Sequence, residues 1–270
     1  SNNIYMDDLL ISVESEDLAT ELKEESLSLF SEMQMDLTKW QDNWLTKNEC
    51  VGLFGLTWNS KSDLLLLPNL DEYPSINTKR ELSSFICGFW DPLGLCAPFI
   101  IIFKLILSKL WRLKLSWDEI MPPNFLKEIN NQLKSLPVLK GVTVPRSVRI
   151  KPCHTKLCVF TDASQKAYGA AVYIYNFDGN GICLQQNLLI SKSRVAPSKI
   201  STTPRLELCA ALLGAKLLNF TKNALESVDD YLLFSDSQVV LFWIRGSNNK
   251  VKPFIQNRIL QIRKLTLATK

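Results

Sequence analysis

The sequence predicts an α/β (α+β) fold in which a mixed β-sheet is flanked by helices. Residues 157–162 and 231–236 are apolar runs that each end in an aspartate, and such runs are typical of β-strands. A helical pattern at residues 202–214 lies between them. This order of strand, helix and strand places Asp162 and Asp236 at the ends of regular elements.

The other elements of residues 151–270 follow from local signals. A tight turn at residues 178–181 separates two strand patterns, and a threonine pair followed by Pro204 is typical of a helix start. Ala211 and Gly214 share a helical face with Glu207, and small residues there would bring Glu207 near the end of the first strand. The expected strands are 169–175 and 182–190, and the expected later helices are 239–244, closed by Gly246, and 254–269.

Three carboxylates of this region are candidate metal ligands: Asp162, Glu207 and Asp236. Acids gathered at the ends of neighbouring elements repel one another unless divalent cations neutralise them. Each also has a simpler structural explanation. Asp162 alone would be a turn residue, Glu207 would complement the helix dipole, and Asp236 would cap the following helix.

Four motifs occur in the order found in a known family: FTDASQKAYGAAVY, ISKSRVAP, TTPRLELCAALLGAKLL and FSDSQVVLFWIRGS. Together they resemble the ribonuclease H (RNase H) region of the Pol polyprotein of BEL/Pao-type retrotransposons, over most of residues 150–265. The resemblance implies a domain that hydrolyses the RNA strand of RNA/DNA hybrids. It also implies Mg²⁺ or Mn²⁺ as cofactor, with Asp162 bridging two ions while Glu207 and Asp236 each hold one.

Basic residues beside these motifs are candidate contacts to the nucleic-acid backbone. They are Arg205, Lys192, Arg194 and Lys199, of which Arg205 ranks first because it lies beside Glu207. The resemblance implies that RNA is selected through its 2′-hydroxyl groups. The expected partners are therefore an RNA/DNA hybrid or another duplex, and the remainder of the Pol polyprotein.

The chain departs from the RNase H pattern after Asp236. RNase H domains carry a fourth carboxylate after a fifth strand, but no Asp or Glu follows Asp236. The RNase H-like sheet is therefore expected to lack its last strand and last metal ligand, and the isolated chain is expected to be weak or inactive as an enzyme. The alternative is a degenerate fragment that keeps the fold and binds duplex nucleic acid without cleaving it.

Residues 1–65 begin with two acids between strand-like residues, in Tyr5-Met6-Asp7-Asp8. This pattern suits a hairpin. It resembles the YXDD motif of reverse transcriptases, which implies Asp7 and Asp8 as metal ligands in the C-terminal part of a polymerase palm. The upstream half of that palm is not in the chain, so no DNA synthesis is expected.

The rest of this region predicts one helix and two short strands. Residues 14–33 predict an amphipathic helix with Leu18, Leu22, Leu27 and Phe30 facing inward, and residues 36–40 and 52–58 predict short strands.

Residues 66–150 predict a packed helical module. The expected helices are 78–90, 95–111 and 123–136, and residues 91–94 separate the first helix from the second. The third helix has Phe125, Ile129 and Leu133 on one face. The run KRELSSFICGFWDPLGLCAP resembles the same BEL/Pao proteins at the position of the polymerase thumb and connection. Prolines at 145 and 152 favour a boundary near residue 150. Lys104, Lys109, Arg112 and Lys114 suit phosphate contacts or a solvated face.

A peptidase name is also attached to this family region, and it implies aspartic-protease chemistry. Such an enzyme needs an Asp-Thr-Gly or Asp-Ser-Gly loop, in which paired aspartates share a proton and activate water. The sequence contains neither tripeptide. A peptidase is therefore the least favoured of the three hypotheses.

Composition limits the remaining classes. The net charge of +4 permits a nucleic-acid partner without indicating one. The seven cysteines show no paired framework and fit buried thiols in a reducing, intracellular compartment. His154, between Cys153 and Cys158, has no second ligand pair at zinc spacing, so no zinc site is expected. Residues 93–111 are apolar but include Pro98 and two lysines, which favours a buried helix over a membrane span.

Overall fold

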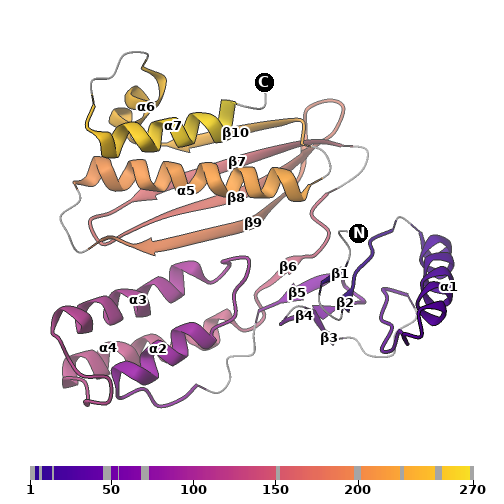
Figure 1. The fold of residues 1–270 in the computed structure, drawn as a ribbon, viewed down its shortest axis with the longest axis horizontal. Coiled ribbons are helices and arrows are strands. Elements are labelled where there is room, and N and C mark those ends of the chain that lie inside the picture. Colours follow the sequence, from indigo (N-terminus) through magenta and orange to yellow (C-terminus); the bar gives the residue numbers. More distant parts are fainter. Residues whose placement is uncertain are drawn as a thin grey trace.

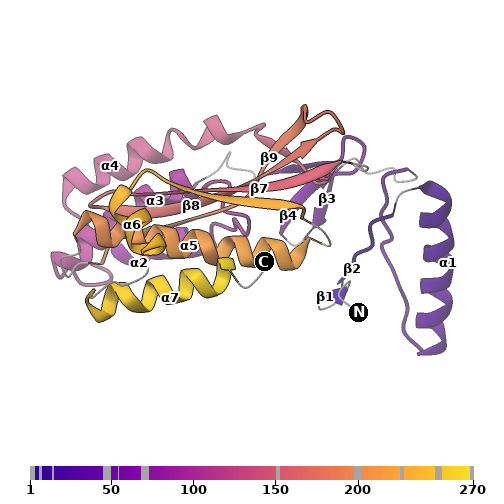
Figure 2. The same ribbon diagram turned by 90° about the horizontal axis from the view of Figure 1, so that it is seen from above.

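The structure is a computed structural model of the chain. It describes residues 4–5, 8–13, 15–44, 50–53, 55–67, 73–149, 153–197, 202–225, 228–246 and 251–267. Within these residues the strands form three sheets: a two-stranded hairpin, a four-stranded antiparallel sheet and a four-stranded mixed sheet. The mixed sheet lies beside the helical module, and helix α1 stands to one side of both (Figures 1 and 2).

The mixed sheet has the strand order β10-β7-β8-β9. β10 is parallel to β7, whereas the β7–β8 and β8–β9 pairs are antiparallel. This arrangement confirms the predicted mixed sheet, with β8 and β9 longer than the sequence indicated. The bounds are β7 (His154–Ala163), β8 (Ala167–Phe177), β9 (Cys183–Val195) and β10 (Asp230–Ser235).

Helix α5 (Thr203–Ala224) lies across β7 and β8. A Cβ atom on Gly214 would lie 2.5 Å from Cγ2 of Thr161 and 3.0 Å from Cγ1 of Val159. Only glycine permits so close an approach, so the predicted role of Gly214 is confirmed. Ala211 instead packs in a second apolar cluster, with the helices α6 (Gln238–Arg245) and α7 (Pro253–Leu267). The helix therefore uses two faces, one for the sheet and one for α7, which runs beside it (Figure 2).

The predicted helical module is confirmed as α2 (Lys79–Gly88), α3 (Ala97–Arg112) and α4 (Pro123–Leu133), followed by a short 3₁₀ turn (Leu136–Leu139). Thr78 and Glu81 form a capping box, in which each side chain accepts the backbone N–H of the other residue. Phe125, Ile129 and Leu133 of α4 are buried, as their spacing predicts. Their core also contains Phe103 and Leu110 of α3.

The N-terminal helix differs from the prediction in its packing. α1 (Glu16–Glu32) forms, but it buries none of its residues, and Leu18 and Leu27 are 45% and 39% exposed. The predicted inward face is therefore wrong for Leu18 and Leu27, whereas Leu22 and Phe30 are half-buried. The physical reason is that, of the residues that the structure describes, the short segment 40–44 is what lies beside this helix, with Lys23 over the ring of Trp40. Residues 36–40 form no strand, and Lys39 has a φ of 55°, which an extended strand does not allow.

The antiparallel sheet joins segments on both sides of the helical module. Its strands are β3 (Cys50–Leu53), β4 (Leu56–Asn59), β5 (Leu64–Leu66) and β6 (Thr143–Pro145), in that order. The first two confirm the strands expected in 52–58. The chain leaves the sheet after β5, forms the module and returns as β6, where Leu64 pairs with Pro145. The domain boundaries near 65 and 150 stay predictions.

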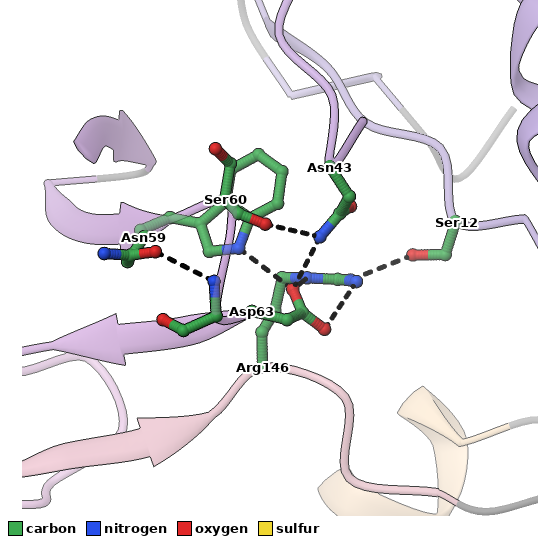
Figure 3. A network of polar contacts seen from close by, with 8 residues as sticks. Ser12, Asn43, Asn59, Ser60, Asp63 and Arg146 are labelled. Carbon is green, nitrogen blue, oxygen red and sulfur yellow. Dashed lines mark hydrogen bonds and ion pairs between the residues drawn. The ribbon is translucent and has the colours of Figure 1, made fainter. Parts of the chain in front are cut away.

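A polar network centred on Asp63 holds this sheet to the N-terminal segment (Figure 3). Arg146 donates to both carboxylate oxygens of Asp63, at 2.6 and 3.1 Å, and to the hydroxyl of Ser12 at 3.3 Å. Asp63 also accepts from the indole of Trp58 and the amide of Asn43. Burial acts to raise the pKa of the Asp63 carboxyl, but these hydrogen bonds and the charge of Arg146 outweigh it and lower the pKa.

No helix in the described part of the chain combines the length and the apolar character needed to cross a membrane.

Candidate functional site

Asp162 and Asp236 lie at neighbouring positions on two adjacent strands. β7 and β10 are parallel, and the last pair in register is Thr161 with Ser235. The next residue of each strand is therefore one of the two aspartates, at the same edge of the sheet. Both residues are exposed and line one cleft of about 740 Å³. The structure thus brings together two of the three predicted carboxylates.

The ends of these two strands are tied by Thr161. Its hydroxyl, which is buried, donates to the carbonyl oxygen of Phe234 at 2.9 Å. One oxygen of Asp162 accepts the backbone N–H of Ala163 at 2.6 Å. This local bond fixes the direction of the carboxylate and uses only part of its capacity, because an ionised carboxylate has about four lone-pair positions.

Glu207 reaches the same region from α5, by way of Ser237. The Ser237 hydroxyl donates to Oε2 of Glu207 at 2.5 Å and accepts the backbone N–H of Val240 at 3.3 Å. Ser237 is the N-cap of α6, so the cap is Ser237 rather than Asp236 as the sequence suggested. A serine that directly precedes a helix is a common cap. The position of Ser237 in the sequence was therefore the signal that could have identified the cap. Glu207 is linked to the residue next to Asp236, although it does not line the cleft.

The donor chemistry of these residues suits a hard divalent cation, because carboxylate oxygens are the ligands that Mg²⁺ and Mn²⁺ prefer. Among the residues that the structure describes, no three Asp, Glu, His or Cys side chains are grouped closely enough to hold an ion. Asp162 and Asp236 both line the cleft, whereas Glu207 does not line it and is hydrogen-bonded to Ser237. Completing a three-carboxylate site therefore requires Glu207 to turn one oxygen toward the cleft.

The rest of the cleft is apolar and comes from two parts of the molecule. Phe160 and Phe234, one residue pair below the strand ends, stack with ring centroids 5.0 Å apart and planes 12° from parallel. Ala97, Pro98 and Ile101 of α3 form part of the lining, as do residues of β9. The cleft is thus bounded by the mixed sheet on one side and by the helical module on another.

The predicted basic residues lie in different places. Lys192 is among the residues that line the cleft, but it pairs with Ala170, which is buried in the cluster under α5. Its neighbours Ser191 and Ser193 point to the helical module, so the side chains of Lys192 and Arg194 lie on the opposite, α5 face of β9. Arg205 instead lies 5.3 Å from the ring centroid of Phe254 in α7, where Arg258 stacks on the same ring at 3.4 Å. Arg205 therefore contacts α7 and does not line the cleft.

Several other predicted residues cannot be placed in the cleft. Asp7 and Lys199 lie outside the described residues, and for Asp8 only the backbone is described, where β2 (Asp8–Leu9) pairs with β1 (Ile4–Tyr5). This pairing confirms the predicted hairpin. On the module, Lys109 forms an ion pair with Glu128 at 3.1 Å, while Arg112 and Lys114 are exposed beyond it.

A mixed sheet of this order, with helices packed on it, defines an RNase H-like α/β fold beside an antiparallel sheet. Residues 78–237 match the family model described as "Pao retrotransposon-like RNaseH-like domain". This match covers more than half of the 270 residues. The chain belongs to the Pao retrotransposon-like RNaseH-like domain family, which confirms the resemblance found in its motifs.

Two of the solved structures that are similar to this chain come from a foamy virus. The foamy viral protease-reverse transcriptase dRH in complex with double-stranded DNA is 15% identical, with a TM-score of 0.54 over 94% of this chain and 42% of that one. The foamy viral protease-reverse transcriptase in complex with double-stranded DNA is 16% identical, with a TM-score of 0.51 over 95% and 50%. This chain therefore spans half or less of their lengths, and the likeness is one of fold. No curated protein matches the chain.

Proposed function

We propose that the chain is the RNase H region of a retrotransposon Pol polyprotein, and that in the complete protein it hydrolyses the RNA strand of RNA/DNA hybrids. The observation that carries this proposal is the pair Asp162 and Asp236, which end adjacent parallel strands and line one cleft. Parallel strands present such residues at one edge of an α/β sheet, where ligands of these folds bind.

Asp162, Asp236 and Glu207 would hold the Mg²⁺ or Mn²⁺ that this reaction needs. When bound, a pair of such ions activates water and stabilises the leaving oxygen. The chain's own contribution is orientation. Thr161 ties the two strand ends, and Ser237 holds Glu207 next to Asp236. A carboxylate can accept the Ser237 hydrogen bond through one oxygen and bind an ion through the other.

The nucleic acid would be held by basic residues on β9 and beyond. Lys192 and Arg194, which lie on the α5 face near the end of this edge strand, are proposed to contact phosphates at the rim of the sheet. Lys199 and Arg205 are proposed as further backbone contacts, with Arg205 acting from the α5–α7 side. A partner of this kind is supported by the foamy viral structures, which were solved in complex with double-stranded DNA.

The same proposal extends to the first 150 residues. Residues 1–65 are proposed to be the end of a reverse transcriptase palm, with Asp7 and Asp8 as metal ligands. Residues 66–150 are proposed to be its thumb and connection. The support is the β1–β2 hairpin at these acids and the fold similarity to foamy viral chains over 94–95% of this chain.

The test is Mg²⁺-dependent cleavage of a labelled RNA/DNA hybrid by the chain. Asp162→Asn and Asp236→Asn keep the shape of the side chain but remove its charge, so each is expected to abolish cleavage. Asp36→Asn is the matched control, since Asp36 is an exposed acid of residues 36–40, far along the chain from the cleft, and it is expected to cleave as the unaltered chain does. Equal cleavage by all three variants would contradict the assignment.

A second candidate is a nucleic-acid-binding module without nuclease activity. The observation that favours it is the position of Glu207, whose hydrogen bond to Ser237 leaves two carboxylates in the cleft. Hybrid binding that is unchanged by Asp162→Asn, with no cleavage by any form of the chain, would support this candidate over the nuclease.

A further inference from the structure

The loop between α2 and α3 is bonded to β9, the edge strand of the mixed sheet. The backbone N–H of Ser191 donates to the carbonyl oxygen of Leu93 at 2.8 Å. The Ser191 hydroxyl donates to the carbonyl oxygen of Gly94 at 2.5 Å. The Ser193 hydroxyl donates to the carbonyl oxygen of Ala97 at 3.3 Å. Two residues of β9 thus bind three carbonyl groups of the backbone that leads into α3.

Asp91 gives this loop its shape. Its carboxylate accepts the backbone N–H of Leu95 at 2.9 Å and that of Cys96 at 2.7 Å. The backbone N–H of Gly94 also donates to the carbonyl oxygen of Asp91, which closes a turn over residues 91–94. We call these four residues the docking turn. Their fixed shape presents the carbonyl oxygens of Leu93 and Gly94 to β9.

Gly94 is needed at this position for two reasons. Its φ of +70° lies in the left-handed region, which residues with a side chain rarely adopt. A Cβ atom at Gly94 would also lie 2.7 Å from the carbonyl carbon of Ser191 and closer still to its oxygen. The turn and the strand therefore meet backbone to backbone, with no room for a side chain.

The docking turn determines where α3 begins, and α3 begins at the cleft. Ala97, Pro98 and Ile101, in the first turns of this helix, line the same cleft as Asp162 and Asp236. Of the module's helices, α3 is the one that contacts β9. The position of this wall is thus set by the bonds from Ser191 and Ser193.

We infer that the docking turn makes the helical module a part of the nucleic-acid site, with Gly94 and Ser191 as positioning residues that hold α3 against the acidic cleft. This inference rests on the proposed nuclease function and adds the module to its site. A strand that reaches Asp162 in the cleft contacts the start of α3 as well as the sheet. Loosening the turn should therefore weaken substrate binding more than it slows the bond-breaking step.

The chain offers a matched pair of glycines for the test. Gly94 and Gly141 both have positive φ, at +70° and +80°, so an alanine is strained at either position. A Cβ atom added to Gly141 would have no neighbour within 4 Å, whereas one added to Gly94 would meet Ser191. Comparing Gly94→Ala with Gly141→Ala thus separates the loss of docking from backbone strain. Ser191→Ala, which removes one hydrogen bond and adds no atom, is a milder variant for the case in which Gly94→Ala folds poorly.

The first readout is amide hydrogen exchange at Ser191 in the full chain. Exchange should become faster in Gly94→Ala and stay as slow as in the unaltered chain in Gly141→Ala. The second is steady-state cleavage of a labelled RNA/DNA hybrid with Mg²⁺. Gly94→Ala should raise KM about tenfold with a smaller change in kcat, because it displaces a binding wall. Ser191→Ala should change KM in the same direction by less.

Two results would overturn the inference. Slow exchange at Ser191 in Gly94→Ala would show that the turn is not docked through these bonds. Fast exchange with an unchanged KM would show that the turn is structural and that α3 is no part of the site. If the unaltered chain binds hybrid without cleaving it, the dissociation constant of the hybrid replaces KM. Failure of the proposed nuclease is thereby distinguished from failure of the docking turn.

Discussion

The two four-stranded sheets of this molecule are held together in different ways. Strands of the mixed sheet run for up to 13 residues, and their inward side chains, such as Leu157 and Ile174, are fully buried under α5. Strands of the antiparallel sheet have only three or four residues, and Trp58 is its one nearly buried apolar side chain among the described residues. The second sheet instead carries the Asp63–Arg146 pair beside its strands. From this difference we expect apolar burial to stabilise the first sheet and a charged hydrogen-bond network to stabilise the second.

The largest expected effect is on the mixed sheet. Ile174→Ala removes a side chain that is 0% exposed in the cluster beneath α5, and such a deletion costs about 2–5 kcal/mol because it leaves a cavity. Leu184→Ala is the control, since Leu184 lies in the same sheet but is 53% exposed and should cost less than about 0.5 kcal/mol. Urea unfolding followed by circular dichroism measures both. Equal losses would contradict apolar burial as the source of this sheet's stability.

A smaller effect is expected from the charged pair of the antiparallel sheet. Arg146→Met leaves Asp63 partly buried without its main partner and should cost about 1–2 kcal/mol, with the partial exposure limiting the loss. Arg80→Met is the matched control: Arg80 binds Asp118 with the same two-bond geometry, at 2.6 and 2.9 Å. That pair is 60% and 71% exposed, against 30% and 29% for Arg146 and Asp63. Unfolding followed by fluorescence should show a larger loss of stability for Arg146→Met than for Arg80→Met. Equal losses would show that burial does not make the Asp63–Arg146 pair more stabilising.

The smallest expected effect is the pH dependence that Asp63 gives to the antiparallel sheet. Because the folded chain lowers the pKa of Asp63 below its ordinary 3.8, the unfolded chain binds more protons in this range. The contribution of Asp63 to stability is therefore complete above pH 3.8 and is lost as pH falls through the lower, folded-state pKa.

This pH effect can be isolated with Asp63→Asn, which cannot titrate. The NMR signal of the Trp58 indole N–H is a local probe, since this group donates to Asp63 at 3.0 Å. Acid unfolding of the unaltered chain should be steeper than that of Asp63→Asn over the acid range. Parallel curves would show that Asp63 has the same pKa in both states.

The sequence predicted those elements whose signals are local. The capping residues Thr78 and Glu81, the apolar face of α4 and the acids that end β7 and β10 are all patterns within a few neighbouring residues. The alignment of Asp162 with Asp236 followed because parallel strands end at one edge. These features could be anticipated without knowing what the rest of the chain does.

What the sequence missed depends on contacts between distant segments. α1 has an apolar pattern, but the pattern does not reveal that, among the described residues, a short segment is all that lies beside it. The link from Ser237 to Glu207 joins residues 30 positions apart, and the bond from the Ser191 hydroxyl to Gly94 of the docking turn joins residues 97 positions apart. Neither has a sequence period to mark it. The roles of Asp162, Glu207 and Asp236 stay predictions, because a fold places residues without showing what they bind.

The return of the chain at β6 has a consequence for how the molecule is made. Asp63 and Arg146 are 83 positions apart, so a ribosome finishes the entire helical module before it delivers the residues that complete the antiparallel sheet. Until then β5 presents an unpaired edge, and unpaired edges recruit other chains. The module can form its own core during this interval, since the buried residues of its apolar cluster lie within residues 76–136. Nascent chains that stop before residue 143 should therefore contain a folded module and a sheet that is open to aggregation.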